Sequence, residues 1–297
     1  MTIRYDVIIP TLNAQSCIAR LVESLMAQTI PPERILIVDS RSEDSTAQII
    51  RSFGSVELLT VERREFDHGG TRDMAVRSCN APFFVLMTQD ALPVDAHCME
   101  SLLSSFTGRR IAAVCARQVA YPDARASERA VRAFRYTDQS MIWDMDDLKR
   151  LGVRAFLLSD VCTAYRRSAY LDVGGFEHPI GTNEDMLIAA DFLRAGYQLA
   201  YSAQAQVWHS HNHTLRQEYE RNKKIGEFLA HYEDRLPGAG EMGEGMRMVR
   251  QISVELLKGG RFGEWIAFGL NCVARLLGNR AGRREEGKRA KKVRMNQ

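Results

Sequence analysis

The sequence has no long hydrophobic run, no paired cysteines and no leader pattern, and each absence excludes a class of protein. Its longest uncharged apolar runs, 80–89 and 265–274, are ten residues each, against the ~20 that a membrane-spanning helix needs. The six cysteines include no CxxC pair, so neither a zinc site nor a disulfide framework is indicated. The first residues lack the charged-then-apolar order of a signal peptide. We therefore expect a cytoplasmic protein with free thiols.

The sequence also lacks a large excess of either acidic or basic residues. The 40 Lys and Arg residues nearly balance the 37 Asp and Glu residues, which gives a formal net charge of +3 and no general argument for nucleic acid as a partner. The charges are distributed unevenly along the chain, because residues 258–297 carry 11 basic and three acidic side chains. Apolar side chains precede most of these charges, so the segment fits either an anionic membrane surface or a packing helix with a solvated tail.

Short apolar runs rich in Ile and Val alternate with segments of helical periodicity in the first third of the chain. The runs predict strands over residues 5–9, 35–38, 56–61 and 83–87. The periodic segments predict helices over residues 18–26, 71–79 and 95–106. This alternation is typical of an α/β protein, and we expect a central, mostly parallel sheet flanked by helices.

Beyond residue 110 the pattern is less regular. We predict strands over 156–164, 197–201 and 205–209, and a helix over 184–195 that ends at Gly196. A glycine-rich linker follows Pro237, and after it come one or two helices and a basic tail from Arg280. The chain therefore predicts one large α/β domain with a helical C-terminal extension.

Polar residues follow three of the predicted strands, at the edge of a parallel sheet where ligands bind. They are Pro10–Asn13, Asp39–Thr46 and Thr88–Asp90. Asp39 ends an apolar strand and is placed to accept hydrogen bonds from a base or a ribose. Asp90 either holds a divalent cation that bridges phosphates or caps the following turn. The three strand ends predict one acidic, hydroxyl-rich rim.

Three further groups have both a structural and a functional interpretation. Residues 66–72 lead through two glycines into a helix, where Arg72 favours contact with a diphosphate or a base, unless the segment is a plain glycine turn. Glu184 and Asp185 either favour the positive end of a helix dipole or supply a general base. The histidines 209, 211 and 213 alternate, so on a strand they would share one face, and we expect one of them to bind a hard cation.

The order of these motifs resembles family 2 glycosyltransferases of the GT-A fold, over roughly residues 3–235. The resemblance rests on VIIPTLN at 7–13, IVDSRSEDST at 37–46, TQD at 88–90, GGF at 174–176 and NED at 183–185. Within the family, residues 66–72, 88–91 and 207–212 look most like bacterial rhamnosyltransferases that use dTDP-L-rhamnose. The resemblance implies a GT-A catalytic domain over 1–236, with a nucleotide-binding half (1–110) and an acceptor-binding half (111–236), and an extension over 237–297.

The resemblance also implies an activity and its residues. The enzyme would move a sugar, with inversion, from dTDP-L-rhamnose to a hydroxyl of a glycan or lipid-linked glycan acceptor in cell-surface polysaccharide synthesis. Asp185 would be the base, and Asp90 with His209, or with His211 in its place, would hold Mg²⁺ or Mn²⁺. Thr88 stands where the family usually has the first carboxylate of a DxD motif. Substrate would contact Thr11, Asn13, Asp39, Gly70, Thr71, Arg72, Gln89 and Glu184.

Two other classes of protein remain as alternatives. A sugar nucleotidyltransferase also reads nucleotide phosphates, but it would be expected to carry a glycine-rich, basic loop after the first strand, and Pro10–Asn13 is not such a loop. A membrane- or nucleic-acid-binding protein would act through the basic tail. No aromatic residues are interleaved with the tail's basic residues, so nucleic acid is the less favoured partner. We expect a cytoplasmic enzyme, and the tail leaves two alternatives open: attachment to the inner face of the cell membrane, or a packing helix with a solvated end.

Overall fold

The computed structural model describes residues 3–238 and 243–295, and it divides into two compact units. The first, called the sheet unit here, comprises the described residues of Met1–Val119, Tyr136–Leu151 and Ala155–His209. The second, called the helical unit, comprises the described residues of Ala120–Arg135, Gly152–Arg154 and Ser210–Gln297. Residues 239–242 of the predicted linker lie outside the described part of the chain.

The sheet unit is built on one mixed sheet, in which nine strands are described. Its first half has the order β3-β2-β1-β4 with every pair parallel, and these four strands confirm the four predicted in the first third. Their bounds are β1 (Tyr5–Thr11), β2 (Arg34–Asp39), β3 (Val56–Thr60) and β4 (Phe83–Met87). Because β1 is covered on both faces, Val7 and Ile8, which point to opposite sides, are both fully buried.

The second half of the sheet is where antiparallel pairing enters. Strand β8 (Cys162–Arg166) runs antiparallel to both β4 and β6 (Ile111–Val119), and β6 pairs in parallel with β9 (Gln198–Trp208). Two short strands, β5 (Leu92–Pro93) and β7 (Met141–Trp143), pair antiparallel with β9. The expected mostly parallel sheet is thus parallel through β4 and mixed beyond it.

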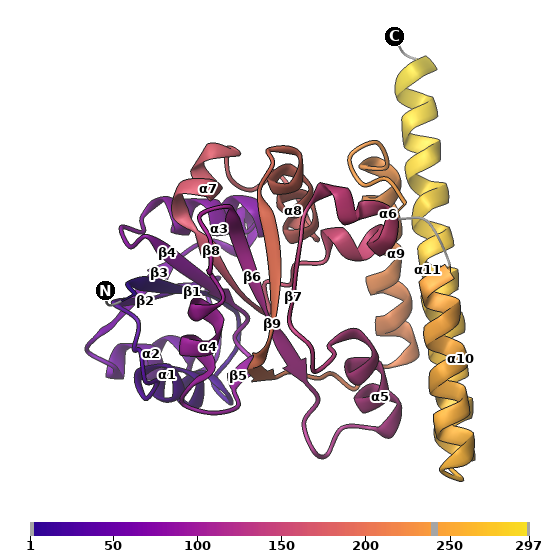
Figure 1. Cartoon of the computed structure of the whole chain (residues 1–297), viewed down its shortest axis with the longest axis horizontal. Helices are drawn as coiled ribbons and strands as arrows, with labels where there is room; N and C mark the ends of the chain where they lie inside the picture. The colour runs from indigo at the N-terminus through magenta and orange to yellow at the C-terminus, as the bar shows by residue number, and fades with distance from the viewer. Residues whose placement is uncertain (1–2, 239–242, 296–297) are drawn as a thin grey trace. The chain divides into compact units, whose positions relative to one another are not determined.

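Helices cover both faces of this sheet (Figure 1). On one face lie α1 (Ile18–Met26), α2 (Thr46–Ser52) and α4 (Cys98–Ser104), whose buried side chains join the main core with Val7 and Ile9. On the other face lie α3 (His68–Arg77), α7 (Arg167–Asp172) and α8 (Glu184–Arg194). The helix predicted at 18–26 is confirmed with the same ends, and the helices predicted at 71–79, 95–106 and 184–195 are confirmed with shifted ends.

Three local predictions are corrected by the structure. Strand β8 begins at Cys162, because residues 157–161 form a loop and a turn. The two strands expected over 197–209 are one strand, β9, with a register shift opposite Ala116 and Arg117. Since β9 ends at Trp208, the alternating histidines do not lie on a strand. Their spacing of two residues therefore does not put them on one face, contrary to the prediction from the sequence.

The helical unit contains α5 (Ala126–Arg135), α9 (Leu215–His231), α10 (Gly243–Lys258) and α11 (Phe262–Met295). A small apolar core joins α5, α10 and α11 through Val131, Ile252 and Phe268. Helices α9 and α11 approach closely at Gly226 and Gly282, where an added Cβ would meet the backbone of the facing helix. Among the described residues, no helix is both long and apolar enough to span a bilayer.

Shorter elements complete the described chain. They are the α-helix α6 (Leu148–Leu151) and the 3-10 helices η1 (Arg63–Glu65), η2 (Met145–Asp147) and η3 (Gly152–Phe156). All six cysteines are free, and those at 79, 98, 115 and 162 are buried, as the sequence predicts.

Candidate functional site

The ends of β1, β2 and β4 meet at one rim, as the sequence predicts. The side-chain amide of Gln89 exchanges two hydrogen bonds with the backbone of Leu12, at 2.7 and 3.1 Å. The Ser42 hydroxyl accepts the Asn13 N–H at 2.8 Å and donates to the Asp39 carboxylate at 2.5 Å. Gln89, Asn13 and Ser42 therefore tie the three loops together, and Asp39 is held at the carboxyl edge of β2.

Asp39 and Thr11 are both almost fully buried at this rim. The Asp39 carboxylate also accepts the backbone N–H of Ser42 at 3.0 Å, while the Thr11 hydroxyl donates to the carbonyl of Ile9 at 3.2 Å. These bonds hold both side chains at the ends of adjacent strands, whose register pairs Thr11 with Asp39. Contact between this pair and a nucleotide stays a prediction.

The start of α3 is closed by its own cap rather than open to a ligand. The side chain of Asp67 accepts the N–H of Gly70 at 2.7 Å and that of Ile180 at 2.6 Å, and its carbonyl accepts the N–H of Thr71 at 2.9 Å. Gly69 lies so close to the carbonyl of Glu177 that no Cβ would fit. The N–H groups of Gly70 and Thr71 are therefore paired with Asp67, and substrate contact by these two residues stays a prediction.

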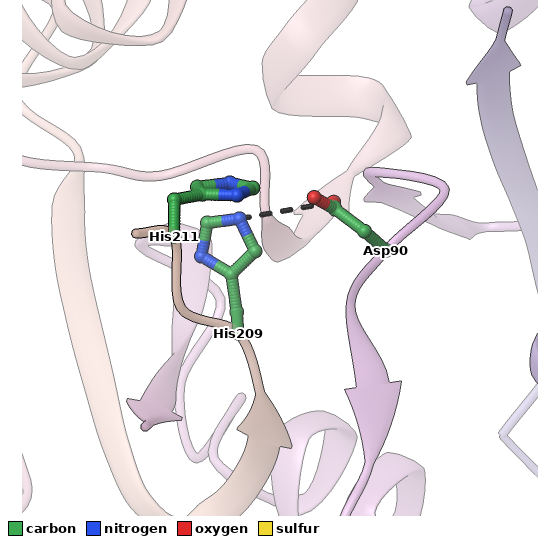
Figure 2. A group of neighbouring side chains, drawn as sticks. All are labelled: Asp90, His209 and His211. Atoms are coloured by element: carbon green, nitrogen blue, oxygen red, sulfur yellow. Dashed lines mark ion pairs between the residues drawn. The ribbon is translucent and has the colours of Figure 1, made fainter. Parts of the chain in front are cut away.

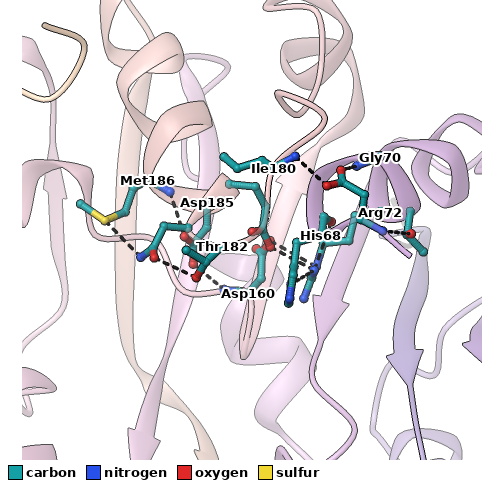
Figure 3. Close-up of polar contacts among 12 residues, drawn as sticks. His68, Gly70, Arg72, Asp160, Ile180, Thr182, Asp185 and Met186 are labelled. Atoms are coloured by element: carbon teal, nitrogen blue, oxygen red, sulfur yellow. Dashed lines mark hydrogen bonds and ion pairs between the residues drawn. The ribbon is translucent and has the colours of Figure 1, made fainter. Parts of the chain in front are cut away.

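Arg72 lies in a buried cluster of carboxylates (Figure 3). Its Nη1 is 3.0 Å from Oε1 of Glu184 and its Nε is 3.8 Å from Oδ2 of Asp160, while its side chain is only 7% exposed. Nη1 also donates to the carbonyl of His68 at 3.2 Å. The guanidinium thus holds α3 against the start of α8 and against the turn before β8.

Glu184 and Asp185 open α8 directly after Asn183, whose φ of 61° sets the turn into the helix. Oδ1 of Asp185 accepts the N–H of Met186 at 2.9 Å, and its Oδ2 lies 3.4 Å from the backbone nitrogen of Asp160. Burial, with the neighbouring carboxylates of Glu184 and Asp160, raises the pKa of Asp185 well above its usual range. A carboxylate with a raised pKa in such a site is suited to accept a proton.

Asp160 was not among the predicted site residues. The apolar run predicts a strand over 156–164 that would include it, although the polar pair Ser159-Asp160 interrupts that run and marks the turn that the structure shows. Burial, strengthened by Glu184 and opposed by Arg72 and Tyr165, raises the pKa of Asp160 to about 7. In the sequence, the polar pair Ser159-Asp160 is the one signal that Asp160 lies on a turn and not inside a strand.

Asp90 and His209 form a second, separate pair in the sheet unit (Figure 2). Oδ1 of Asp90 is 3.7 Å from Nε2 of His209, and His209 is buried directly after β9. The side-chain amide of Gln118 lies close to the hydroxyls of Tyr136 and Ser159, at 2.6 and 2.8 Å, so its oxygen faces Nδ1 of His209 at 2.9 Å. With the amide in this orientation Nδ1 donates to the oxygen of Gln118, and Nε2 is the ring nitrogen that faces Asp90.

This pair fits a divalent cation. Metal-binding histidines typically hydrogen-bond through their other ring nitrogen to an oxygen, as Nδ1 of His209 does with Gln118, and the atoms of Asp90 and His209 that could bind a cation lie within 4.8 Å of one another. The hydroxyl of Thr88, at the position of the missing DxD carboxylate, is buried without a hydrogen-bond partner in the described structure. His211, also drawn in Figure 2, follows two residues after His209 and belongs to the helical unit.

Known proteins resemble this chain in sequence and in fold. Residues 6–174 match the glycosyl transferase family 2. The O-antigen chain rhamnosyltransferase RfbN of Salmonella typhimurium is 36% identical over 286 residues, which cover 94% of this chain and 90% of the relative. The O-antigen chain rhamnosyltransferase WbaN of Salmonella anatum is 38% identical over 288 residues, which cover 94% and 89%.

Solved structures give the fold. The mannosyltransferase PcManGT of Pyrobaculum calidifontis, in complex with GDP-Man and Mn²⁺, superposes with a TM-score of 0.63 at 15% identity, covering 93% of this chain and 86% of that one. Staphylococcus aureus TarS 1–349, in complex with UDP-GlcNAc, gives a TM-score of 0.55 at 14% identity, covering 97% and 92%. These likenesses confirm the predicted GT-A fold.

Proposed function

The chain belongs to family 2 of the glycosyltransferases, and we propose that it transfers L-rhamnose from dTDP-L-rhamnose to a hydroxyl of a glycan or lipid-linked glycan acceptor. It is an inverting glycosyltransferase. The rhamnose donor is supported by two relatives that are named rhamnosyltransferases and align over nearly their whole length. Their names also place them in O-antigen synthesis, which supports a role in making a cell-surface polysaccharide.

The catalytic proposal rests on one observation. The turn at Ser159 and Asp160 joins the acidic cluster around Arg72 to the Asp90–His209 pair. The backbone N–H of Asp160 points to Asp185, and the adjacent Ser159 hydroxyl lies 2.8 Å from the amide nitrogen of Gln118. The amide oxygen of Gln118 in turn accepts from His209. A base and a cation site held on one turn can act on opposite ends of the same glycosyl bond.

In the proposed reaction Asp185 takes the proton of the acceptor hydroxyl as that oxygen attacks the anomeric carbon. The new glycosidic bond forms on the face opposite the nucleotide, so the configuration inverts. The bond between the anomeric carbon and the phosphate oxygen breaks, and the nucleoside diphosphate leaves with the electron pair. Asp185 must be ionised to begin this step, so activity rises as pH rises through its raised pKa.

Asp90 and His209 would hold Mg²⁺ or Mn²⁺. When bound, the cation would neutralise charge that develops on the departing diphosphate. This site is supported by Nε2 of His209, which faces Asp90 at 3.7 Å, and by the Thr88 hydroxyl, which is buried without a hydrogen-bond partner among the described residues. His211 is the alternative ligand, and replacing each histidine separately decides between the two.

We further propose that the enzyme works on the cytoplasmic face of a membrane, held there through α11. Phe262, Ile266, Leu270, Val273 and Leu277 recur along this helix and are each between 51% and 62% exposed. From residue 280 to residue 295 the helix carries eight basic and two acidic residues. An exposed apolar stripe next to a basic segment fits an anionic lipid surface, which also carries lipid-linked acceptors.

A panel of nucleotide sugars, measured by thermal shift with and without Mn²⁺, tests the donor. Binding at 100 times Kd adds about 2.7 kcal/mol of stability, which is well within detection. The proposal predicts stabilisation by dTDP-L-rhamnose that increases with Mn²⁺. Stabilisation by UDP-sugars but not by dTDP-L-rhamnose would contradict the donor and leave the fold intact. Synthesis of a nucleotide sugar from a nucleoside triphosphate would instead favour a sugar nucleotidyltransferase.

A further inference from the structure

Asp160 is a buried carboxylate to which no predicted motif gives a role. It lies on the turn before β8 and is 4% exposed. Its Oδ1 accepts the hydroxyl of Tyr165 at 2.5 Å, while its Oδ2 faces Nε of Arg72 at 3.8 Å without a hydrogen-bond partner in the described structure. Its backbone N–H points to Oδ2 of Asp185 (Figure 3). A buried carboxylate oxygen that accepts no hydrogen bond is costly, which suggests a function.

The cluster contains more acid than base. Three carboxylates, those of Asp160, Glu184 and Asp185, face the single guanidinium of Arg72. Three other titratable groups that face them, Cys115, Cys162 and Tyr165, are neutral at pH 7. Burial raises the pKa of Cys115 and of Tyr165, while the hydrogen bond with the Cys98 thiol, followed by burial, raises the pKa of Cys162. His68 lies on the far side of the guanidinium, with its Nδ1 3.1 Å from Nη1 of Arg72. With all three acids ionised the cluster would be negative in a low-dielectric site, so a proton is retained among them toward neutral pH.

We propose that Asp160 is a positioning residue for sugar transfer: it holds Arg72 beside α8 and, through its own charge, sets the pH at which Asp185 becomes an active base. This inference rests on the proposed role of Asp185. Asp160 does not need to touch substrate, because it faces Arg72 through its side chain and Asp185 through its backbone N–H. Its charge reaches Asp185 at close range, where a like charge opposes ionisation.

Replacing Asp160 by Asn separates charge from shape. An amide has the same size, can keep the hydrogen bond with Tyr165 and can turn its oxygen toward Arg72. The substitution removes a negative charge that raises the pKa of Asp185. The acid limb of the kcat/KM profile should therefore move to lower pH. On that limb, each pH unit of displacement multiplies the ratio of variant to wild-type activity about tenfold.

Asp73→Asn is the matched control. Asp73 is equally buried, accepts the hydroxyl of Tyr170 at 2.8 Å and pairs with Arg77 at 2.5 Å, so the chemistry of the change is the same. It lies on α3 and has no contact with Asp185 among the described polar contacts. This variant should lose stability and keep the wild-type acid limb.

Thermal stability gives a readout that does not depend on activity. The pKa of Asp160 rises from ~3.9 in the unfolded chain to about 7 in the fold. A group with a raised folded pKa stabilises fully below its unfolded value, and that stability is lost as pH rises through the folded value. Wild-type Tm should therefore fall, relative to that of Asp160→Asn, between about pH 4 and pH 7. A purely structural role predicts an offset that is independent of pH.

The results of these experiments distinguish the proposed role of Asp160 from the proposed function of the enzyme. A wild-type enzyme that transfers sugar, with an Asp160→Asn acid limb that coincides with the wild-type one, overturns the role of Asp160 and leaves the function intact. Absence of transfer from any nucleotide sugar overturns the proposed function, and the pH dependence of Tm then still decides whether Asp160 is ionised within the cluster. A displaced acid limb together with a pH-dependent difference in Tm supports both.

Discussion

Replacing Asp185 by Asn removes the proposed base and leaves most of its surroundings in place. The amide oxygen can still accept the N–H of Met186 at 2.9 Å, and the side-chain volume is unchanged. What is lost is a group that can take the proton of an acceptor hydroxyl. A general base contributes about 10²–10⁴-fold to the rate, which corresponds to ~2.7–5.4 kcal/mol of transition-state stabilisation. The turnover number should fall by that factor.

Stability should not fall with activity in this variant. Asp185 is one of three carboxylates around one guanidinium, so removing its charge relieves repulsion in the cluster. Binding of dTDP-L-rhamnose, followed by thermal shift, should persist. Asp191→Asn is the matched control, because Asp191 lies on the same helix and pairs with Arg194 at 3.5 Å, outside the cluster. Asp185→Asn turnover near that of wild type would refute the assignment of the base.

Three further predictions concern the metal, the membrane and the helical unit. Chelation, or His209→Ala, should abolish the stabilisation by Mn²⁺ of the donor complex measured by thermal shift, whereas His211→Ala should keep it. Ile266→Glu, which places a charge in the exposed stripe of α11, should reduce cosedimentation with vesicles rich in anionic phosphatidylglycerol and leave sugar transfer to a soluble acceptor unchanged. Gly282→Ala should cost about 1–3 kcal/mol in thermal unfolding, because its Cβ would meet the backbone of α9. Gly287→Ala, on the same helix with open space around it, should cost nothing.

Each of these has a contrary outcome. If His211→Ala alone loses the stabilisation by Mn²⁺, the cation binds to His211 and not to His209. Equal binding of the wild-type protein and the 266 variant to anionic vesicles would assign the stripe to something other than lipid. Equal unfolding temperatures for the two glycine variants would mean that α9 and α11 do not approach as closely as the structure shows.

The sequence predicts the first half of the fold well, because the strands and helices of that half each have a clear local sequence pattern. Strands such as β1 and β4 are apolar runs buried on both faces, and α1 carries its apolar stripe at helical spacing. The polar residues that follow these strands must meet at one edge of a parallel sheet. The rim formed around Asp39 and Gln89 is therefore predictable from spacing alone.

The second half depends on pairings between distant segments. That β8 runs antiparallel between β4 and β6 follows from no local signal, and the mixed sheet was therefore not predicted in full. The tautomer of His209 depends on Gln118, 91 residues away in the chain. Asp160 meets Arg72 and Asp185 only in the folded chain, since no spacing in the sequence joins these three residues.

One assay of sugar transfer tests whether the chain is a rhamnosyltransferase. The purified chain is incubated with dTDP-L-rhamnose, Mn²⁺ and membranes that carry lipid-linked acceptors, and release of dTDP is measured together with the rhamnosylated product. Transfer from dTDP-L-rhamnose should yield dTDP and product in equal amounts, and both should be lost in Asp185→Asn. Release of nucleotide from a different donor only, or no product with any nucleotide sugar, would contradict it.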